Sequence, residues 1–196
     1  MTHNTQPMTV FEAIQNRRSV RDYSPQGLDG TTVEALLAAA VRAPTAMHAE
    51  PWRFIVVQDP PLLGRISNRA KALFLDEVRR KHLDLGDYAK LCADPAFSVF
   101  YNAGTLIVIC APQASDFAPA DCWLAAENLM LAAHAQGLGT CVIGSAVEGL
   151  NTPDIRAEIG LPADTLAVAP IIVGVPADNG PPVPRQPPRI LNWLGR

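Results

Sequence analysis

Apolar and polar residues follow two different periods along this 196-residue chain. Helical spacing, with apolar residues three and four positions apart, predicts helices over 9–16, 32–42, 62–83, 119–136 and 153–159. Shorter, almost continuous apolar runs predict buried strands over 53–57, 106–111, 140–143 and 166–175. A few strands interspersed with helices favour a layered α/β fold, an α+β sandwich with helices packed on a sheet.

Residues at the expected helix ends support this pattern. Thr9 with Glu12, and Thr31 with Glu34, have the spacing of a capping box at a helix N-terminus. Gly137 is suited to end the long fourth helix, because glycine readily adopts the left-handed conformation found there. The remaining expected ends are a stop at Pro44 and a start at Thr152 followed by Pro153.

The chain divides into three parts. We expect a flexible N-terminus over 1–8, a single domain over 9–175 and a Pro-rich C-terminal arm over 176–196. Six prolines between Pro176 and Pro188 favour an extended backbone. The arm ends in four apolar residues, Ile190, Leu191, Trp193 and Leu194. These side chains need a surface to bury them, either on a partner subunit or on the same domain. The stiffness and length of the arm favour the partner subunit.

Composition narrows the class of protein. Hydrophobic residues make up 48% of the chain, and the net charge is −3. The longest apolar stretches, 105–111 and 166–175, fall short of the roughly 20 residues that a membrane-spanning helix needs. Residues 1–7 lack the apolar region of a signal peptide. The four cysteines contain no CxxC pair, which favours reduced, buried thiols in a cytoplasmic protein without a membrane partner.

Several common catalytic motifs are absent from the sequence. There is no HExxH or paired Cys/His spacing for a metal, no GxSxG elbow and no Walker sequence. Gly137, Gly139 and Gly144 approximate a dinucleotide fingerprint, but they follow a helix and enter a strand, which is the reverse of the Rossmann order. His134 lies within an Ala-rich helix, where a structural role is favoured. We therefore expect no metal ligands and no catalytic side chain.

One basic cluster could bind a phosphorylated ligand. Arg17, Arg18, Ser19 and Arg21 lie within five positions directly after the first helix. The planar arginine fork donates two parallel hydrogen bonds to phosphate. The alternative is a solvated patch favoured by the dipole at the C-terminal end of a helix. A nucleic-acid interface is disfavoured, because the chain is acidic and no aromatic residues alternate with these arginines.

Two further segments could contact a ligand through their backbone. The stretch 43–54 combines a helix stop, a loop of small residues and a Pro-Trp pair leading into a strand. The stretch 137–145 contains Gly144, which lets the backbone approach a flat ligand closely. Each has a structural alternative: a connection with Trp52 in the core for the first, and an ordinary capped turn for the second.

Together these segments resemble the flavin-dependent (FMN) nitroreductase family over nearly the whole chain. Residues 17–21 are similar to its "RRSxR" segment, and 124–145 are similar to its "GLGTCxIG" segment with the preceding helix. The other similar stretches, in the same order and spacing, are 43–57, 100–111 and 173–185.

The resemblance implies a nitroreductase-like fold, with a central mixed, largely antiparallel sheet flanked by helices. It also implies a homodimer whose C-terminal arm crosses to the partner subunit, with tightly bound FMN at the interface. Carried over by position, the FMN phosphate, ribityl chain and pyrimidine edge would be held by Arg17, Arg18, Ser19 and Arg21. Arg185 would add a further contact to the phosphate. The flavin would be reached from the other subunit by Pro44, Thr45, Ala46 and His48. The ring of the flavin would contact Ile143, Gly144 and Ser145.

The sequence departs from the family pattern at two positions. His48 stands where the family usually has Asn, and Glu50 where it usually has Gln. An imidazole can replace an amide donor, but it can also become charged near neutral pH. The segment 62–95, which often shapes the substrate pocket in such proteins, matches no family pattern.

The function implied is an oxidoreductase that uses NAD(P)H to reduce nitroaromatics, quinones or related small-molecule acceptors. Hydride would pass through flavin N5, with donor and acceptor alternating at one face. A same-fold dehalogenase or ene-reductase is an alternative reaction. A protein that binds or stores FMN without turnover is an alternative of another class.

Overall fold

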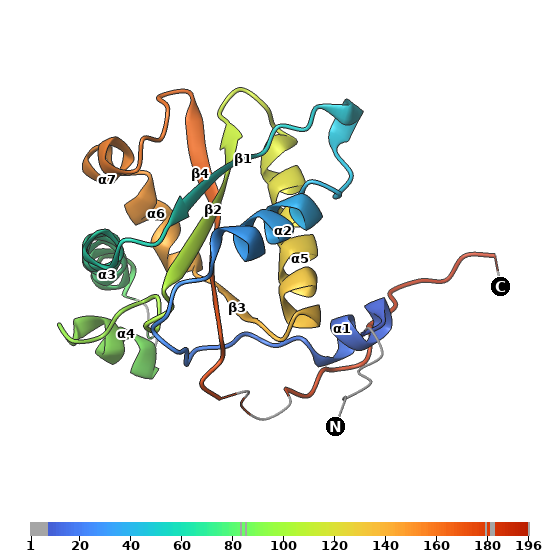
Figure 1. The fold of residues 1–196 in the computed structure, drawn as a ribbon, viewed down its shortest axis with the longest axis horizontal. Coiled ribbons are helices and arrows are strands. Elements are labelled where there is room, and N and C mark those ends of the chain that lie inside the picture. Colours follow the sequence, from blue (N-terminus) through green and yellow to red (C-terminus); the bar gives the residue numbers. More distant parts are fainter. Residues whose placement is uncertain (1–7, 83, 85, 179, 181–182, 196) are drawn as a thin grey trace.

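The core of the protein is a four-stranded sheet in the order β1-β2-β4-β3 (Figure 1). This computed structural model describes residues 8–82, 84, 86–178, 180 and 183–195. The strands are β1 (Arg53–Val57), β2 (Thr105–Pro112), β3 (Gly139–Val142) and β4 (Thr165–Gly174). All neighbouring strands in the order are antiparallel, and all four predicted strands are confirmed. Residues 1–7 of the predicted flexible N-terminus lie outside the described residues.

The two central strands, β2 and β4, are buried on both faces. In β2, Leu106 and Val108 face one apolar cluster, while Ile107 and Ile109 face the other. None of these four side chains is exposed to solvent. The continuous apolar run therefore forms a strand sandwiched between two layers, as the sequence predicts.

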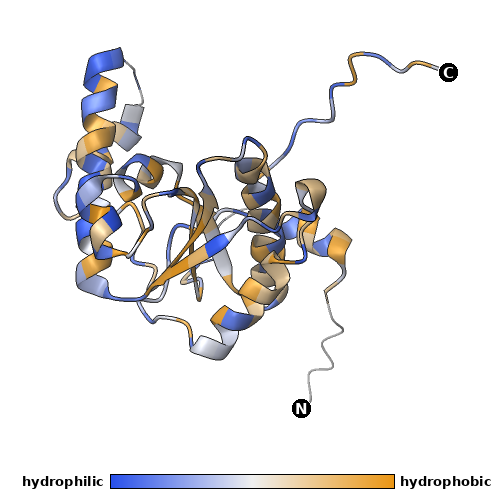
Figure 2. Ribbon diagram, turned by 90° about the horizontal axis from the view of Figure 1, so that it is seen from above, coloured by the Kyte–Doolittle hydropathy of each residue, from blue (hydrophilic) through white to orange (hydrophobic). Residues whose placement is uncertain are grey.

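Helices cover both faces of the sheet, which confirms the predicted fold class (Figure 1). On one face pack α2 (Gly30–Ala40) and α5 (Ala118–Ala135). On the other pack α3 (Pro60–Lys81), α6 (Val147–Leu150) and α7 (Pro153–Glu158). The first helix, α1 (Val10–Asn16), lies against α5. Figure 2 shows the apolar strands between these helical layers.

The helix ends test the capping predictions. Thr9 and Glu12 form the predicted capping box, and Gly137 ends α5 with a φ of 77°. The prediction of Thr31 as a cap is wrong, because α2 begins earlier: the Asp29 carboxylate accepts a hydrogen bond of 2.9 Å from the Thr32 backbone N–H. Thr152 is the N-cap residue of α7 and Pro153 its first residue, as predicted, but the Thr152 hydroxyl donates to the Gly149 carbonyl and makes no cap hydrogen bond.

The stretch that follows the predicted helix 62–83 contains a further helix, for which the sequence analysis made no prediction. α4 (Gly86–Ala93) packs beside the second half of α3, and the pair forms a hairpin at one side of the sheet (Figure 1). The remaining short helical turns are Ala46–His48 and Gly144–Ala146.

The Pro-rich arm is anchored at its base. Tyr23 forms an antiparallel bridge with Pro176, and the Ala177 N–H donates to the Asp22 carbonyl. Beyond this point the described residues 183–195 are exposed in the single chain and extend away from the domain (Figure 1). The predicted crossing to a partner subunit stays a prediction.

Two composition-based expectations concern the thiols and the helices. All four cysteines are free and buried, as predicted: Cys92, Cys110, Cys122 and Cys141. Within the described part of the chain, no helix has the length and apolar character to span a membrane.

Candidate functional site

The arginine-rich segment lies along the edge of the sheet, beside β3. The Val20 N–H donates a 2.9 Å hydrogen bond to the Thr140 carbonyl, and Ser19 forms a parallel bridge with Thr140. Gly139 makes this approach possible, because a Cβ at this position would lie 2.8 Å from the Val20 side chain. Buried Val20 fixes the segment, so the side chains on either side of it are turned outward.

An open cleft of about 600 Å³ adjoins this segment. Its floor is the turn 142–145 at the end of β3, where predicted residues Ile143, Gly144 and Ser145 lie together. Arg21 stands at one side of the cleft. Another wall of the cleft comes from the α3–α4 hairpin and the loop after it: Phe74, Glu77, Tyr88 and Tyr101.

Smaller hollows continue from the cleft along the arginines. Arg21 also lines a hollow of about 320 Å³ that contains Arg18 and Ser19. Arg18 in turn lines a hollow of about 330 Å³ together with Arg17 and Arg185. The structure therefore brings together eight of the twelve predicted residues, in a path that leads from an aromatic cleft to a cluster of arginines.

The arginine end of this path has few anionic partners. Arg17 Nε lies 3.4 Å from a Glu127 carboxylate oxygen, but it is buried with no hydrogen-bond partner among the described residues. Arg18 donates a 2.6 Å hydrogen bond to the Gly180 carbonyl in the arm. The pKa of His134 is lowered, by its burial and then by the charges of Arg18 and Arg17. Positive charge therefore accumulates in the hollow of Arg17, Arg18 and Arg185, whereas Asp22 and Asp178 line the hollow of Arg18 and Ser19.

The cleft end of the path is aromatic and carries hydroxyl groups. Tyr88 and Ser145 share a hydrogen bond of 2.9 Å between their hydroxyl oxygens. Burial raises the pKa of Tyr88 to about 12 and also raises the pKa of Tyr101. Both phenols consequently stay protonated near neutral pH and can serve as hydrogen-bond donors, not as bases.

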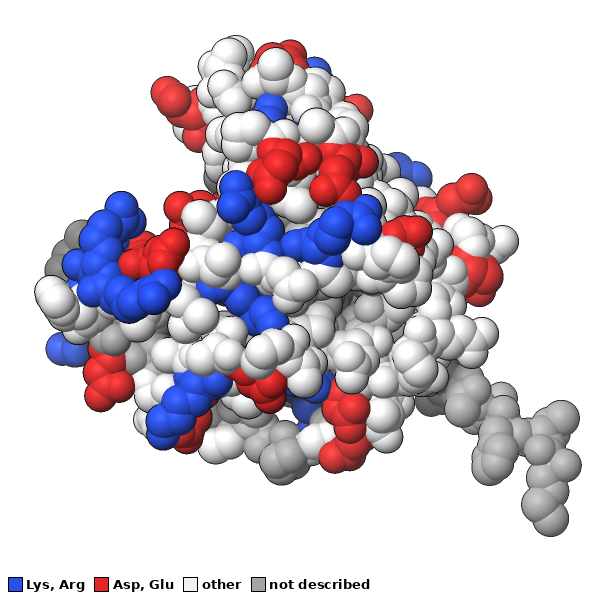
Figure 3. Space-filling model, turned by 90° about the vertical axis from the view of Figure 1, so that its left-hand side faces the viewer, with Lys and Arg blue, Asp and Glu red and all other residues white. Residues whose placement is uncertain are grey.

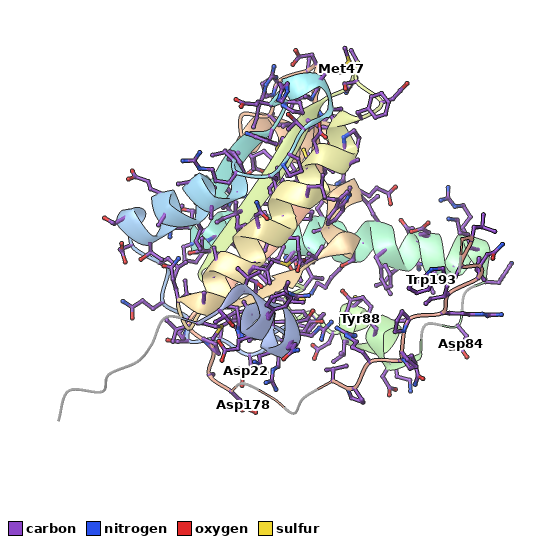
Figure 4. All side chains as sticks on the ribbon, turned by 90° about the vertical axis from the view of Figure 1, so that its right-hand side faces the viewer. Asp22, Met47, Asp84, Tyr88, Asp178 and Trp193 are labelled. Carbon is purple, nitrogen blue, oxygen red and sulfur yellow. The ribbon has the colours of Figure 1, made fainter. Side chains whose placement is uncertain are left out.

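The four predicted residues of 44–48 lie elsewhere. Figure 4 shows Met47, from the same loop, at the opposite end of the molecule from Asp22 and Tyr88. The loop is held in place by the buried Asp121 carboxylate, which accepts a 3.1 Å hydrogen bond from the Ala46 N–H. Its backbone adopts positive φ at Met47, His48 and Glu50. The structure therefore does not bring Pro44, Thr45, Ala46 and His48 to the cleft of their own chain.

The aromatic wall was missed by the sequence reasoning. Phe74, Tyr88 and Tyr101 come from a helix, a second helix and a loop, with no shared motif or spacing. The available signal was that five of the nine Phe and Tyr residues fall within the 28 positions 74–101: Phe74, Tyr88, Phe97, Phe100 and Tyr101.

Two observations bear on other kinds of ligand. The described residues contain no group of three His, Cys, Asp or Glu side chains placed to hold a metal ion. On the face shown in Figure 3, basic and acidic side chains lie beside one another. Two ion pairs join α3 to α7, namely Arg65–Glu158 and Arg69–Asp154. The face in the figure therefore presents mixed charge and not the continuous basic stripe typical of a nucleic-acid interface.

Fold and site together define a class: a three-layer α+β protein with a cleft at the end of an edge strand. The sequence profile of the nitroreductase family matches residues 14–175. The chain belongs to the nitroreductase family.

Individual relatives show the same likeness. A nitroreductase from Bacteroides fragilis, solved with bound FMN, superimposes with a TM-score of 0.77 at 26% identity, covering 94% of this chain and 97% of that one. An iodotyrosine deiodinase from Thermotoga neapolitana is 28% identical over 186 residues, which are 90% of this chain and 94% of that protein. A candidate NADH dehydrogenase/NAD(P)H nitroreductase from Methanothermobacter thermautotrophicus is 28% identical over 176 residues, covering 88% and 80% of the two chains.

Proposed function

We propose that the protein is an FMN-dependent oxidoreductase that oxidises NAD(P)H and reduces small aromatic acceptors such as nitroaromatics or quinones. The observation that carries this proposal is the path from the aromatic cleft to the arginine cluster. FMN has a matching shape, with a flat ring system at one end and a phosphate at the other. The FMN bound by the Bacteroides fragilis relative supports the choice of this nucleotide.

Each end of the path suits one part of FMN. Arg17, Arg18 and Arg185 would hold the phosphate, since guanidinium groups donate paired, charge-assisted hydrogen bonds. Arg17 Nε, buried without a hydrogen-bond partner among the described residues, fits this role. The turn 143–145 would lie against the ring, and Arg21 would stabilise negative charge at the ring's edge. When bound, FMN supplies the two-electron chemistry that the side chains here do not.

We further propose that the active form is a homodimer. Apolar residues of α1 face solvent in the single chain, namely Val10 (69% exposed), Phe11 (77%) and Ile14 (56%). In a dimer, the loop 44–48 of one subunit would reach the cleft of the other, which explains why it is remote from its own.

A second reaction is favoured by one specific observation. The iodotyrosine deiodinase relative covers nearly the whole of both chains at an identity equal to that of the nitroreductase-type relative. Reductive removal of a halogen from an aromatic ring is therefore the alternative to reduction of a nitro group or quinone.

The reaction is tested by anaerobic mixing of the FMN-loaded protein with NADH or NADPH. We expect the visible flavin absorbance to disappear, and to return when a nitroaromatic or a quinone is added. Return of the absorbance only with an iodophenol would identify the dehalogenase. Flavin that stays oxidised with both donors would contradict NAD(P)H oxidation and favour a protein that binds FMN without turnover.

Gly144 provides a test of where the ring lies. A Cβ at Gly144 meets no atom within 4 Å in the protein, so Gly144→Ala should leave the melting temperature unchanged. The added methyl would project into the cleft and weaken FMN binding by about tenfold, the effect of modest overpacking. Fluorescence titration measures the affinity, and an unchanged affinity would place the ring away from this turn.

A further inference from the structure

The aromatic wall of the cleft belongs to a chain of four rings in edge contact. Phe74 and Tyr88 are in edge contact, with ring centroids 5.2 Å apart. Phe97 contacts Tyr88 at 6.3 Å and Tyr101 at 5.4 Å, again edge to face. Three of the rings line the cleft, while Phe97 does not line it and joins Tyr88 to Tyr101. The orientation of the exposed faces therefore depends on where the backbone places Phe97.

A buried lysine fixes that backbone. Lys71, on α3, is only 6% exposed, and its ammonium donates to three carbonyl oxygens: Asp94 at 3.0 Å, Pro95 at 3.4 Å and Phe97 at 2.6 Å. The structure shows no ion pair for Lys71 in the described part of the chain. Burying a charge is costly, and here three carbonyl dipoles of a single turn compensate it.

The preceding turn of α3 adds a second contact. The Ser67 hydroxyl accepts a 3.0 Å hydrogen bond from the Val99 N–H. Ser67 and Lys71 are four residues apart, so they lie on the same face of the helix. Together they bind the loop 94–99 to α3, and this loop leads directly to Tyr101.

Tyr101 itself has an unusual backbone. Its φ is 49°, in the left-handed region that bulky residues rarely adopt, and Asn102 follows with a φ of 60°. Such conformations persist only where the surroundings enforce them, and they gather at functional sites. The loop held by Lys71 and Ser67 provides such surroundings.

We propose that Lys71 is the positioning residue of the acceptor site: by holding the 94–97 turn, it aligns Tyr88 and Tyr101 as a wall that selects planar aromatic acceptors. The part of this inference that concerns the acceptor rests on the proposed function. The part that concerns how Lys71 holds the aromatic wall does not rest on it. Lys71→Met removes the ammonium while keeping a long apolar side chain. Lys90→Met is the matched control, because Lys90 is an exposed lysine of α4 in the same hairpin, paired with Asp87.

The first experiment uses flavin-free protein and hydrogen–deuterium exchange. In Lys71→Met, we expect faster exchange at the amides of 94–101, and unchanged exchange at those of 143–146. Lys90→Met should exchange as the wild type does. Unchanged protection of 94–101 in Lys71→Met would overturn the proposal, whatever the protein is found to catalyse.

The second experiment measures selectivity with FMN-loaded protein. The flavin is reduced photochemically and mixed with a naphthoquinone or with ferricyanide, which needs no aromatic wall. In Lys71→Met, the half-saturating quinone concentration should rise about 3- to 10-fold, as for the loss of one aligned aromatic contact, with ferricyanide unaffected. Equal slowing with both acceptors, or none, would refute the selective role.

Two further outcomes of these experiments can be distinguished from each other. If Lys71→Met does not fold, Phe97→Leu breaks the same chain of rings and carries the same expectation, so normal quinone kinetics in that variant would refute the proposal. If the wild type binds no FMN, the proposed function fails, while the exchange experiment still decides whether Lys71 holds the wall.

Discussion

Alanine in place of Arg18 or Arg21 is expected to weaken FMN binding by about 10- to 100-fold, because each charge-assisted contact contributes about 1.5–3 kcal/mol. The two arginines stand at different points of the path, Arg18 in the hollow it shares with Arg17 and Arg185, and Arg21 at the cleft. Both single variants should therefore lose flavin during dialysis. The measurement is the flavin content after dialysis, followed by titration of the apoprotein with FMN.

Arg65→Ala is the matched control for these variants. Arg65 is an exposed arginine on α3 that bonds to Glu158 at 2.7 Å, and it lines none of the hollows of the path. It should retain as much flavin as the wild type. Full retention of flavin by both Arg18→Ala and Arg21→Ala would contradict the assignment of the site.

Glutamate in place of Phe11 is expected to dissociate the proposed homodimer. Phe11 is 77% exposed in the single chain and lies between other apolar residues on α1. Loss of a central aromatic anchor raises a dimer dissociation constant by about 30-fold or more, and a charge buried in its place adds to the effect. Light scattering after gel filtration measures the mass, and far-UV circular dichroism should be unchanged.

The proposed homodimer should also determine how much flavin the protein retains. Since the loop 44–48 lies remote from the cleft of its own chain, monomeric Phe11→Glu should hold FMN poorly (Figure 4). Val56→Glu places the same charge on a partly exposed apolar residue of β1 and should stay dimeric with flavin. A Phe11→Glu protein that remains dimeric would show that α1 is not in the interface.

Much of the fold could be predicted because burial and periodicity are local signals. The run from Leu106 to Ala111 could only be a strand covered on both sides, and the ends of α1 and α5 followed from Thr9 and Gly137. The start of α2 was misplaced because Thr31 and Asp29 both fit a cap, and only the observed hydrogen bond to Thr32 distinguishes them. Helix α4 was missed because its eight residues are too few to show a clear helical period.

The site could be predicted only where its residues are close in the sequence. Arg17 to Arg21 form one cluster, and 143–145 form one turn, so each was visible as a segment. The aromatic wall depends on contacts across separate elements, such as Tyr88 with Ser145, that spacing does not encode. Buried Lys71 was unpredictable for the same reason, since its partners are carbonyls of a loop 23 to 26 residues away.

The most direct test of the account compares FMN with riboflavin, which has the same ring and ribityl chain but no phosphate. Apoprotein is titrated with each, and the quenching of flavin fluorescence gives the affinity and stoichiometry. The arginine cluster predicts one FMN per subunit, bound at least about 100-fold more tightly than riboflavin. Equal affinities for the two flavins, or no binding of either, would contradict the central claim.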